Sequence, residues 1–327
     1  MKVAILGFGT IGQGVAKVLS DNKDRITELL GEEIVIQKIL DRHDHSGSEF
    51  NHLITSDVEE IYSEDIDLCV EALGGVSDPY TYVEKMLGLG VSVATSNKAL
   101  VCAYGPELFQ IAEKSNSYLL FEGAVGGGIP IIRTLNESLG AEEIIKISGI
   151  MNGTSNFILS KMKEGLNFSD SLKLATEKGY AEKDPSDDID GIDTARKLSI
   201  LVSMASGKKC PYDSIETIGI RDFKEKSLDE LFSEDMCIKL LGTAEKVDNK
   251  WIYKVSPVRI PNTHPFSNVN GVLNSFMVET NSLGVSFYTG EGAGGEATAS
   301  AVVSDLIELA KAKKFGYKIS QRKWTDD

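Results

Sequence analysis

Residues 179–198, GYAEKDPSDDIDGIDTARKL, crowd carboxylates ahead of a lysine that precedes an apolar segment. Asp193 and Lys197 are four residues apart, so in a helix both side chains lie on one side. The next residues, LSILVSMA, are apolar nearly all round, which predicts a buried helix. Burial lowers the pKa of a lysine unless a carboxylate restores its charge. The pattern favours a lysine poised for proton transfer, and the alternative is a surface ion pair.

A second stretch that could form a functional site is GFGTIG, which follows a predicted strand and opens a predicted helix. In that context Gly7 permits a tight turn, Gly9 lets the backbone approach a pyrophosphate, and Gly12 lets helix and strand pack closely. The free N–H groups at the helix start, around Thr10 and Ile11, attract phosphate. The stretch therefore predicts a dinucleotide site, and the alternative is a plain strand–helix turn.

The end of the second predicted strand, ILDRHD, bears on the choice of dinucleotide. Asp41 directly follows the strand and could accept hydrogen bonds from a ribose hydroxyl, which favours NAD. Arg42 could instead pair with a 2′-phosphate, which favours NADP. The position of Asp41 favours NAD, while NADP stays open, and Asp41 could also be an ordinary turn residue.

Ligands of such sheets bind at the carboxyl ends of the strands. The segment VSVATSNKAL predicts Ser96 and Lys98 at that edge, so Lys98 is expected near the nicotinamide. The segment EALGG ends another strand there, and its backbone at Gly74 is expected to line the cofactor. The alternative for Lys98 is a solvated loop lysine.

The acidic run could hold a cationic group of a substrate. Its candidate carboxylates for this role are Glu182, Asp188 and Asp193. Three others compete with them: Asp184, Asp187 and Asp190. We expect the run to stay a loop until about Ile192. Beside a dinucleotide site, this charge predicts hydride transfer on a small substrate with an ammonium group.

Two more glycine-rich stretches stand out. In FEGAVGGGIPII, backbone carbonyls near Glu122 could ligate a hard monovalent cation, or the glycines simply cross between domains. The stretch TGEGAGGEATASAVV leads into a predicted helix, whose N-terminus could approach the cofactor from another side.

The elements that must position these residues form an α/β pattern. Strand-like and helix-like segments alternate over the first 140 residues, which predicts a mostly parallel, Rossmann-type sheet. After GGGIPIIRTLNESLG the pattern changes to helices and turn-bounded strands, typical of an α+β domain. We expect a dinucleotide-binding domain over 1–135, a second domain over 136–295, and a C-terminal helical segment over 296–327 that packs back on the first.

Composition excludes some function classes. A net charge of −15 over 327 residues argues against nucleic acid and anionic membrane surfaces as partners. No apolar run reaches the ~18 residues of a membrane span, and MKVAILGFG does not have the pattern of a signal peptide. The four cysteines show no CxxC spacing, which predicts reduced thiols in a cytoplasmic protein.

Six motifs occur in order: GFGTIG, TSNKAL, EGAVGGGIPII, GIMNGTSNFIL, GYAEKDPSDDIDGIDTARKL and GEGAGGEATASAVV. Together they resemble homoserine dehydrogenase over nearly the whole chain. The resemblance implies reversible, NAD- or NADP-dependent interconversion of homoserine and aspartate 4-semialdehyde, on the route to threonine, methionine and isoleucine. It also implies a homodimer, with substrate binding and dimerisation in a second domain that contains a mixed sheet.

The resemblance implies roles for matched residues. Lys98 and Lys197 would lie near the reacting C4 oxygen, with Lys197 as the acid–base group. Glu182 would bind the substrate ammonium, supported by Asp188 and Asp193. A sodium site would use Glu122, Val125, Gly127 and Ile129, mostly through carbonyl oxygens, and Gly292 or Gly294 would touch the cofactor.

Three features depart from the family pattern. Many members carry a C-terminal regulatory domain, whereas this chain ends at KISQRKWTDD, so we expect no feedback by that route. NADP-preferring members often have Arg in the place of Asp41. The segment TSNK replaces the commoner TANK.

Two rival functions are open to test. An aspartate-semialdehyde dehydrogenase needs a cysteine nucleophile with a nearby base, and no histidine is suitably placed for Cys102. A non-catalytic nucleotide sensor would need neither both lysines, Lys98 and Lys197, nor the acidic cluster.

Overall fold

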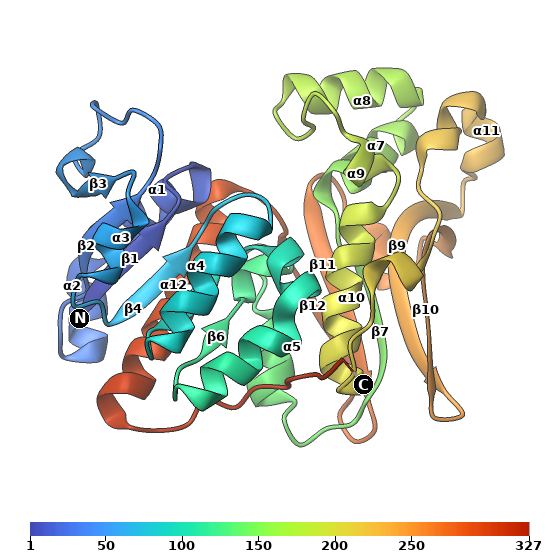
Figure 1. Ribbon diagram of the computed structural model, residues 1–327. Coiled ribbons are helices and arrows are strands. Elements are labelled where there is room, and N and C mark those ends of the chain that lie inside the picture. Colours follow the sequence, from blue (N-terminus) through green and yellow to red (C-terminus); the bar gives the residue numbers. More distant parts are fainter. Residues whose placement is uncertain (327) are drawn as a thin grey trace. The chain divides into compact units, whose positions relative to one another are not determined.

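The apolar sequence KVAIL forms the first strand, β1 (Lys2–Leu6), which lies inside a parallel sheet. The computed structural model describes residues 1–326 (Figure 1). The chain divides into two units. One comprises Met1–Gly127 and Gly294–Lys323, and the other comprises Gly128–Ala293 with the residues from Trp324. The division falls at Gly127, whereas the sequence placed a boundary near residue 135.

The first unit contains a six-stranded sheet in the order β3-β2-β1-β4-β5-β6, with every pair parallel. Its further strands are β2 (Val35–Leu40), β3 (Ile54–Thr55), β4 (Leu68–Glu71), β5 (Ser92–Thr95) and β6 (Leu119–Leu120). This is the strand order of a Rossmann dinucleotide-binding fold, so the predicted fold class is confirmed.

Helices join and cover these strands: α1 (Thr10–Asp21), α2 (Lys23–Leu30), α3 (Val58–Tyr62), α4 (Ser77–Gly88), α5 (Lys98–Lys114) and α12 (Gly295–Phe315). Helix α12 packs against α1 and the sheet. Ile5, Val15 and Leu306 meet in this core and are fully buried, each stabilising the fold by about 1.5–3 kcal/mol. A Cβ at Gly14 would lie 2.9 Å from the Cβ of Ala299, so a glycine there lets the two helices approach.

The second unit contains a mixed sheet in the order β12-β11-β7-β9-β10-β8. Its strands are β7 (Ile144–Ile150), β8 (Glu216–Thr217), β9 (Met236–Val247), β10 (Lys250–Pro261), β11 (Leu273–Thr280) and β12 (Gly284–Glu291). All pairs are antiparallel except β8 with β10. The sequence did not predict β9, which is among the longest strands of the sheet.

The helical elements of this unit are α6 (Ile131–Arg133), a π-helical turn (Thr134–Ser138), α7 (Gly153–Lys163), α8 (Phe168–Glu177), α9 (Ser186–Ile189), α10 (Ile192–Ser206) and α11 (Leu228–Leu231). Helix α10 packs against β7, β9 and β10, while α7 packs against β9 and β11. The apolar residues Leu198, Ile200 and Leu201 of α10 are buried, as predicted.

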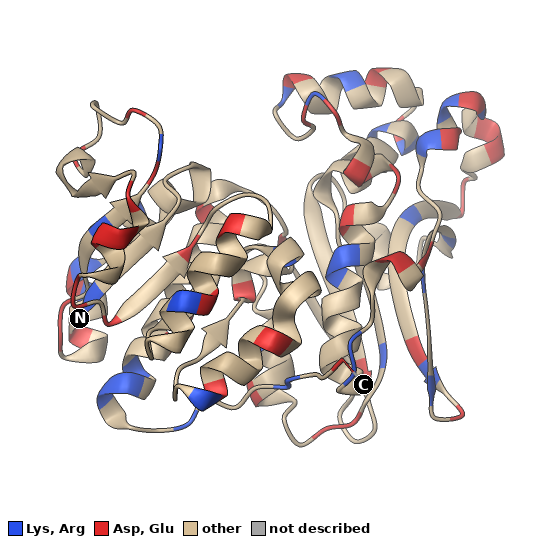
Figure 2. Ribbon diagram, viewed as in Figure 1, with Lys and Arg blue, Asp and Glu red and all other residues tan. Residues whose placement is uncertain are grey.

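Among residues 1–326, no helix combines the length and the apolar character needed to cross a membrane. Acidic and basic residues are interspersed along both units (Figure 2). None of the four cysteines forms a disulfide.

Candidate active site

The lysine that ends the acidic run lies in a buried polar cluster of the second unit. Lys197 on α10 is 8% exposed. Its Nζ donates to Oδ2 of Asp193 at 2.7 Å and to the carbonyl oxygen of Met151 at 2.8 Å. The predicted i,i+4 pair therefore exists, but it is buried, and a buried ion pair is weak evidence for a purely stabilising role.

Asn152 extends this cluster from the turn between β7 and α7. Its side-chain amide donates to the same oxygen of Asp193 at 2.9 Å and to Oδ1 of Asp188 at 2.6 Å. Its amide oxygen accepts the N–H of Ser155 at 2.8 Å and so caps α7. Asn152 holds two carboxylates beside one another. No role was predicted for Asn152 from the sequence, although asparagine directly before a helix is a capping signal.

Asp188, one of the two predicted support carboxylates, has a perturbed pKa. Burial raises its pKa, Asn152 lowers it through its hydrogen bond, and the charge of Asp193 raises it further. A cation that arrives beside Asp188 would lower this pKa again, because it favours the ionised form. The carboxyl group is suited to binding an ammonium group.

The competing carboxylates of the run have other partners. Asp187 pairs with Arg196, while Asp190 binds Arg221 through both oxygens at 2.6 and 2.7 Å. Asp184 accepts a hydrogen bond from Ser186 at 2.6 Å. Part of the predicted loop is the one-turn helix α9, so the expectation of a continuous loop to Ile192 was wrong.

Glu182 lies apart from this hydrogen-bonded cluster. It is exposed, and no hydrogen bond within residues 1–326 joins it to Asp188, Asp193 or Lys197. The nearby carbonyl of Tyr180 accepts the hydroxyl of Thr154 at 2.7 Å, which ties the segment before Glu182 to α7.

The glycines of GFGTIG have separable roles in the first unit. Gly7 has φ +97°, in the region that favours glycine, and a Cβ at Gly12 would lie 1.9 Å from the carbonyl oxygen of Gly7. A Cβ at Gly9 would meet no protein atom within 4 Å. Helix α1 begins at Thr10 with no side-chain cap on its N–H groups. Gly12 therefore serves packing, while Gly9 borders open space at a helix start of the kind that attracts anions.

Asp41 follows β2 and is bound to the glycine-rich turn. Its Oδ2 accepts the N–H of Phe8 at 2.7 Å, and its Oδ1 accepts the N–H of His43 at 2.8 Å. Burial would raise the pKa of Asp41, but backbone hydrogen bonds from His43 and Phe8 and side-chain bonds from His43 and His45 lower it to about 2. Asp41 is therefore ionised at neutral pH.

Three predicted cofactor residues line one pocket of about 230 Å³. These are Asp41, Arg42 and Gly74, and Leu73 and Tyr82 contribute to the same lining. The exposed guanidinium of Arg42 pairs with Asp78, also in the lining, at 2.9 Å. The pocket lies beside the carboxyl ends of β2 and β4, where a Rossmann fold binds the adenosine ribose.

Lys98 is the first residue of α5, directly beyond the carboxyl end of β5. Ser96, in the connecting turn, lies against Gly123, where a Cβ would come within 3.0 Å of the Cβ of Ser96. Glu122 opens the short 3₁₀ helix Glu122–Ala124 and is buried, and its N–H donates to Asp305 of α12 at 2.7 Å. The predicted edge thus contains both Lys98 and the start of the predicted cation segment.

The two C-terminal glycines lie in different units. Gly294 precedes α12 in the first unit, and a Cβ at the next residue, Gly295, would lie 2.7 Å from Cγ2 of Thr10. The start of α12 thus adjoins the start of α1. Gly292 belongs to the second unit and packs against Asn274 of β11.

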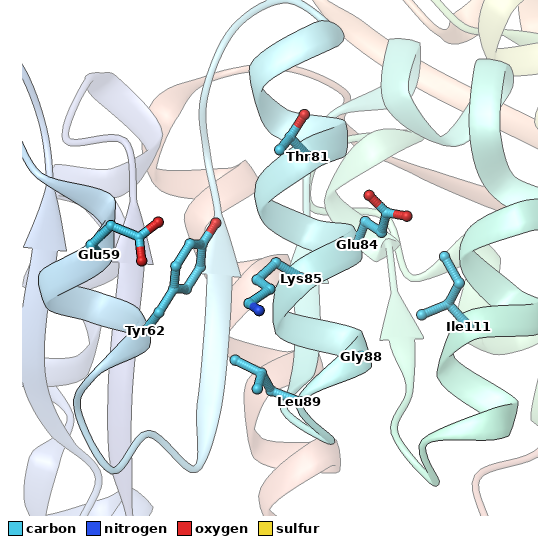
Figure 3. Close-up of a pocket in the computed structure, with 8 residues that line it drawn as sticks. All are labelled: Glu59, Tyr62, Thr81, Glu84, Lys85, Gly88, Leu89 and Ile111. Carbon is cyan, nitrogen blue, oxygen red and sulfur yellow. The ribbon is translucent and has the colours of Figure 1, made fainter.

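A larger hollow of about 610 Å³ lies on the surface of the first unit (Figure 3). Tyr62 of α3 and Lys85 of α4 face one another there. Its lining contains no residue of the sites above and consists mainly of exposed side chains, so we do not place the chemistry there.

A Rossmann sheet with a glycine-rich turn, in a chain that also buries an ion-paired lysine, defines a dinucleotide-dependent oxidoreductase. Residues 7–122 match the family model "Homoserine dehydrogenase, NAD binding domain", and residues 130–307 match "Homoserine dehydrogenase". The chain belongs to the homoserine dehydrogenase family. It is an NAD(P)-dependent enzyme that interconverts homoserine and aspartate 4-semialdehyde.

Relatives and solved structures agree with this membership. The homoserine dehydrogenase of Lactococcus lactis is 38% identical over 325 residues, covering 97% of this chain and 76% of the relative. The crystal structure of the Thiobacillus denitrificans enzyme has a TM-score of 0.90 at 38% identity, covering 96% and 74%. A hyperthermophilic archaeal homoserine dehydrogenase in complex with NADPH has a TM-score of 0.81 at 28% identity, covering 98% and 99%.

Proposed function

We propose that Lys197 is the acid–base group of the homoserine dehydrogenase reaction. The observation that carries this proposal is its burial, with Nζ held between Asp193 and the carbonyl of Met151. In the oxidation direction Lys197 takes the proton of the substrate hydroxyl, and in reduction it returns that proton to the C4 oxygen. When bound, NAD(P) accepts or supplies the hydride. For Lys98 we propose a second positive charge near the same oxygen.

The carboxylates would bind the other end of the substrate. Asp188 and Asp193 are held by Asn152, and Asp188 has a raised pKa that a cation would lower. Glu182 is exposed and joins this set only as the ligand that the family resemblance implies for the substrate ammonium. These carboxylates would hold the ammonium group while Lys197 serves the hydroxyl group.

We propose NAD as the preferred dinucleotide. An ionised Asp41 in the pocket would accept hydrogen bonds from ribose hydroxyls and repel a 2′-phosphate. Arg42, which could pair with a 2′-phosphate, already pairs with Asp78. The test is the near-ultraviolet absorbance of reduced cofactor, with homoserine plus NAD or NADP at mildly alkaline pH. Faster reduction of NADP would overturn the preference. No absorbance change with either cofactor, in protein shown to bind a dinucleotide, would contradict the activity itself.

We also propose a sodium ion at the segment that begins with Glu122. The donor set fits a hard cation, because the Glu122 carboxyl group is buried and the carbonyls of Val125 and Gly127 accept no N–H within residues 1–326. Ile129 completes the set that the resemblance implies. A melting temperature that rises in sodium chloride but not in choline chloride supports the site, and equal values in both salts count against it.

Two further proposals concern the whole protein. None of the four cysteines forms a disulfide, which supports a cytoplasmic location that fractionation of the source cells would test. Exposed apolar residues on β12 support a homodimer.

A further inference from the structure

Glu71 is the last residue of β4 and is fully buried, at 0% exposure. Its Oε2 accepts a hydrogen bond from the hydroxyl of Thr95 on the adjacent strand β5. Its Oε1 accepts the N–H of Leu73 at 2.8 Å and the side-chain amide of Asn97 at 3.5 Å. One carboxyl group therefore joins the turn after β4 to the turn after β5.

The partners of this carboxyl group continue the network to the start of α5. Thr95 Oγ1 accepts the N–H of Asn97 at 2.9 Å, and the Asn97 amide donates to the carbonyl of Gly75 at 2.9 Å. The amide oxygen of Asn97 accepts the N–H of Leu100 at 3.0 Å and caps α5. Lys98 is the first residue of that helix, so the network fixes its backbone.

We propose that Glu71 is a positioning residue for the dehydrogenase reaction, whose ionised carboxylate clamps turn 73–75 and the start of α5 in their cofactor-binding geometry. This inference rests on the proposed roles of Lys98 and of the backbone at Gly74. Protonation converts one carboxyl oxygen from an acceptor into a donor. It reverses the hydrogen bond with Thr95 and weakens the one from Leu73, because hydrogen bonds to an ionised acceptor are stronger.

The clamp titrates close to neutral pH. Burial raises the pKa of Glu71, and the hydrogen bonds from Thr95, Leu73 and Asn97 oppose it, which leaves the pKa at about 7. Elements β1, β5, α4 and α12 pack against β4. Their titratable groups include Tyr82 on α4, Asp305 on α12 and Lys2 at the far end of β1, while β5 has none. Cys69 belongs to β4 itself, and Lys98 begins α5, which the network reaches through Asn97. Burial and then Glu71 raise the pKa of the Cys69 thiol, so Cys69 stays neutral in this range.

The same titration predicts how stability depends on pH. The ordinary pKa of glutamate, 4.5, applies to Glu71 in the unfolded chain, and the folded value is higher. The folded protein therefore binds more protons between these two values, so the contribution of Glu71 to stability is lost as pH rises through this window. A buried charge that costs stability is consistent with a functional role.

The decisive variant is Glu71→Gln, an isostere of the protonated acid. We would measure kcat/KM for the dinucleotide, at saturating homoserine, from about pH 6 to about pH 9. As pH rises through the pKa of Glu71, the unmodified enzyme should gain about tenfold more than Glu71→Gln, because the proton transfer proposed for Lys197 affects both enzymes alike. The melting temperature of Glu71→Gln should also lack the decline with pH that the titration of Glu71 causes. Glu84→Gln, an exposed change on α4, should keep both dependences.

A second variant tests the positioning role of Glu71 if Glu71→Gln does not fold. Thr95→Val removes one hydrogen bond to the carboxylate, so it should raise the pKa of Glu71 and move the activity rise about one unit higher in pH. An unchanged rise in Glu71→Gln, or an unmoved rise in Thr95→Val, overturns the positioning role. An absence of dehydrogenase activity would give a different result from an absence of the positioning role. In that case the unmodified enzyme would not oxidise homoserine at any pH.

Discussion

Asp193 accepts hydrogen bonds from two side chains through one oxygen atom, from Lys197 at 2.7 Å and from Asn152 at 2.9 Å. Removing one member of a buried, hydrogen-bonded pair leaves the other unsatisfied, which costs more than the pair itself contributes. The cluster is therefore sensitive to single changes. A test of catalysis must separate lost chemistry from lost folding.

Lys197→Met retains the apolar stem of the side chain and removes its charge. We expect kcat to fall at least about a hundredfold, because proton transfer is lost, with the dinucleotide dissociation constant changed less than about threefold. Circular dichroism checks the fold, and fluorescence titration gives the dissociation constant. Lys183→Met removes an exposed lysine of the same run and should leave kcat unchanged. A Lys197→Met enzyme with normal kcat would remove Lys197 from the mechanism.

The glycine-rich turn between β1 and α1 offers a prediction about an element, because two of its glycines face different surroundings. In Gly12→Ala the new methyl group meets the carbonyl of Gly7 at 1.9 Å, so the turn must open. We expect a lower melting temperature together with weaker dinucleotide binding. In Gly9→Ala the methyl group meets no protein atom within 4 Å, and we expect it to block the approach of the pyrophosphate predicted for this turn.

Gly9→Ala should therefore keep its melting temperature within about 2 °C of the parent and still lose dinucleotide affinity about tenfold or more. Thermal denaturation and fluorescence titration of both variants give the comparison. Equal losses of stability in the two variants would contradict the separate roles.

A helix or strand can be predicted from the sequence when the residues that cause it to form lie within the segment itself. The strands β1, β4 and β5 are short apolar runs between turn signals, and α10 has an apolar surface, so sequence found them. Strand β9 contains Leu, Lys, Ala and Glu, which favour helices, and it is a strand because β7 and β10 pair with it on both sides. Pairing between distant segments is invisible in a local pattern.

The candidate site shows the same division. The spacing of Asp193 and Lys197 predicted their pair, because one helix turn determines it. Nothing in the spacing separated Asp188 from Asp187 and Asp190. Asn152 and Arg221 come from other segments, and Arg196 follows Asp187 by 9 residues, which is not the spacing of neighbours on one helix. Asn152 was missed for this reason too, since its contacts span 36 and 41 residues of sequence.

At the scale of the whole molecule, one face of the second sheet carries apolar side chains at its edge. Val285 and Phe287 lie opposite Glu279 and Met277 in the β11–β12 ladder, so they share one face. The ring of Phe287 packs at a tilt against that of Phe266, with the ring centroids 5.2 Å apart. Val285 is 59% exposed, and Leu283 in the adjoining turn is also exposed. Neighbouring exposed apolar side chains of this kind mark an association surface.

We therefore expect a homodimer in solution that uses this face. Val285→Lys should raise the dissociation constant of the dimer at least about tenfold, because a lysine charge would be desolvated at the interface. Ile252→Lys is the matched control, since Ile252 is a similarly exposed apolar residue, at 61%, on β10 at another part of the same sheet. Sedimentation velocity over a range of protein concentrations measures both variants. A monomeric parent protein refutes the dimer, and dissociation by Ile252→Lys alone places the interface at the β9–β10 hairpin.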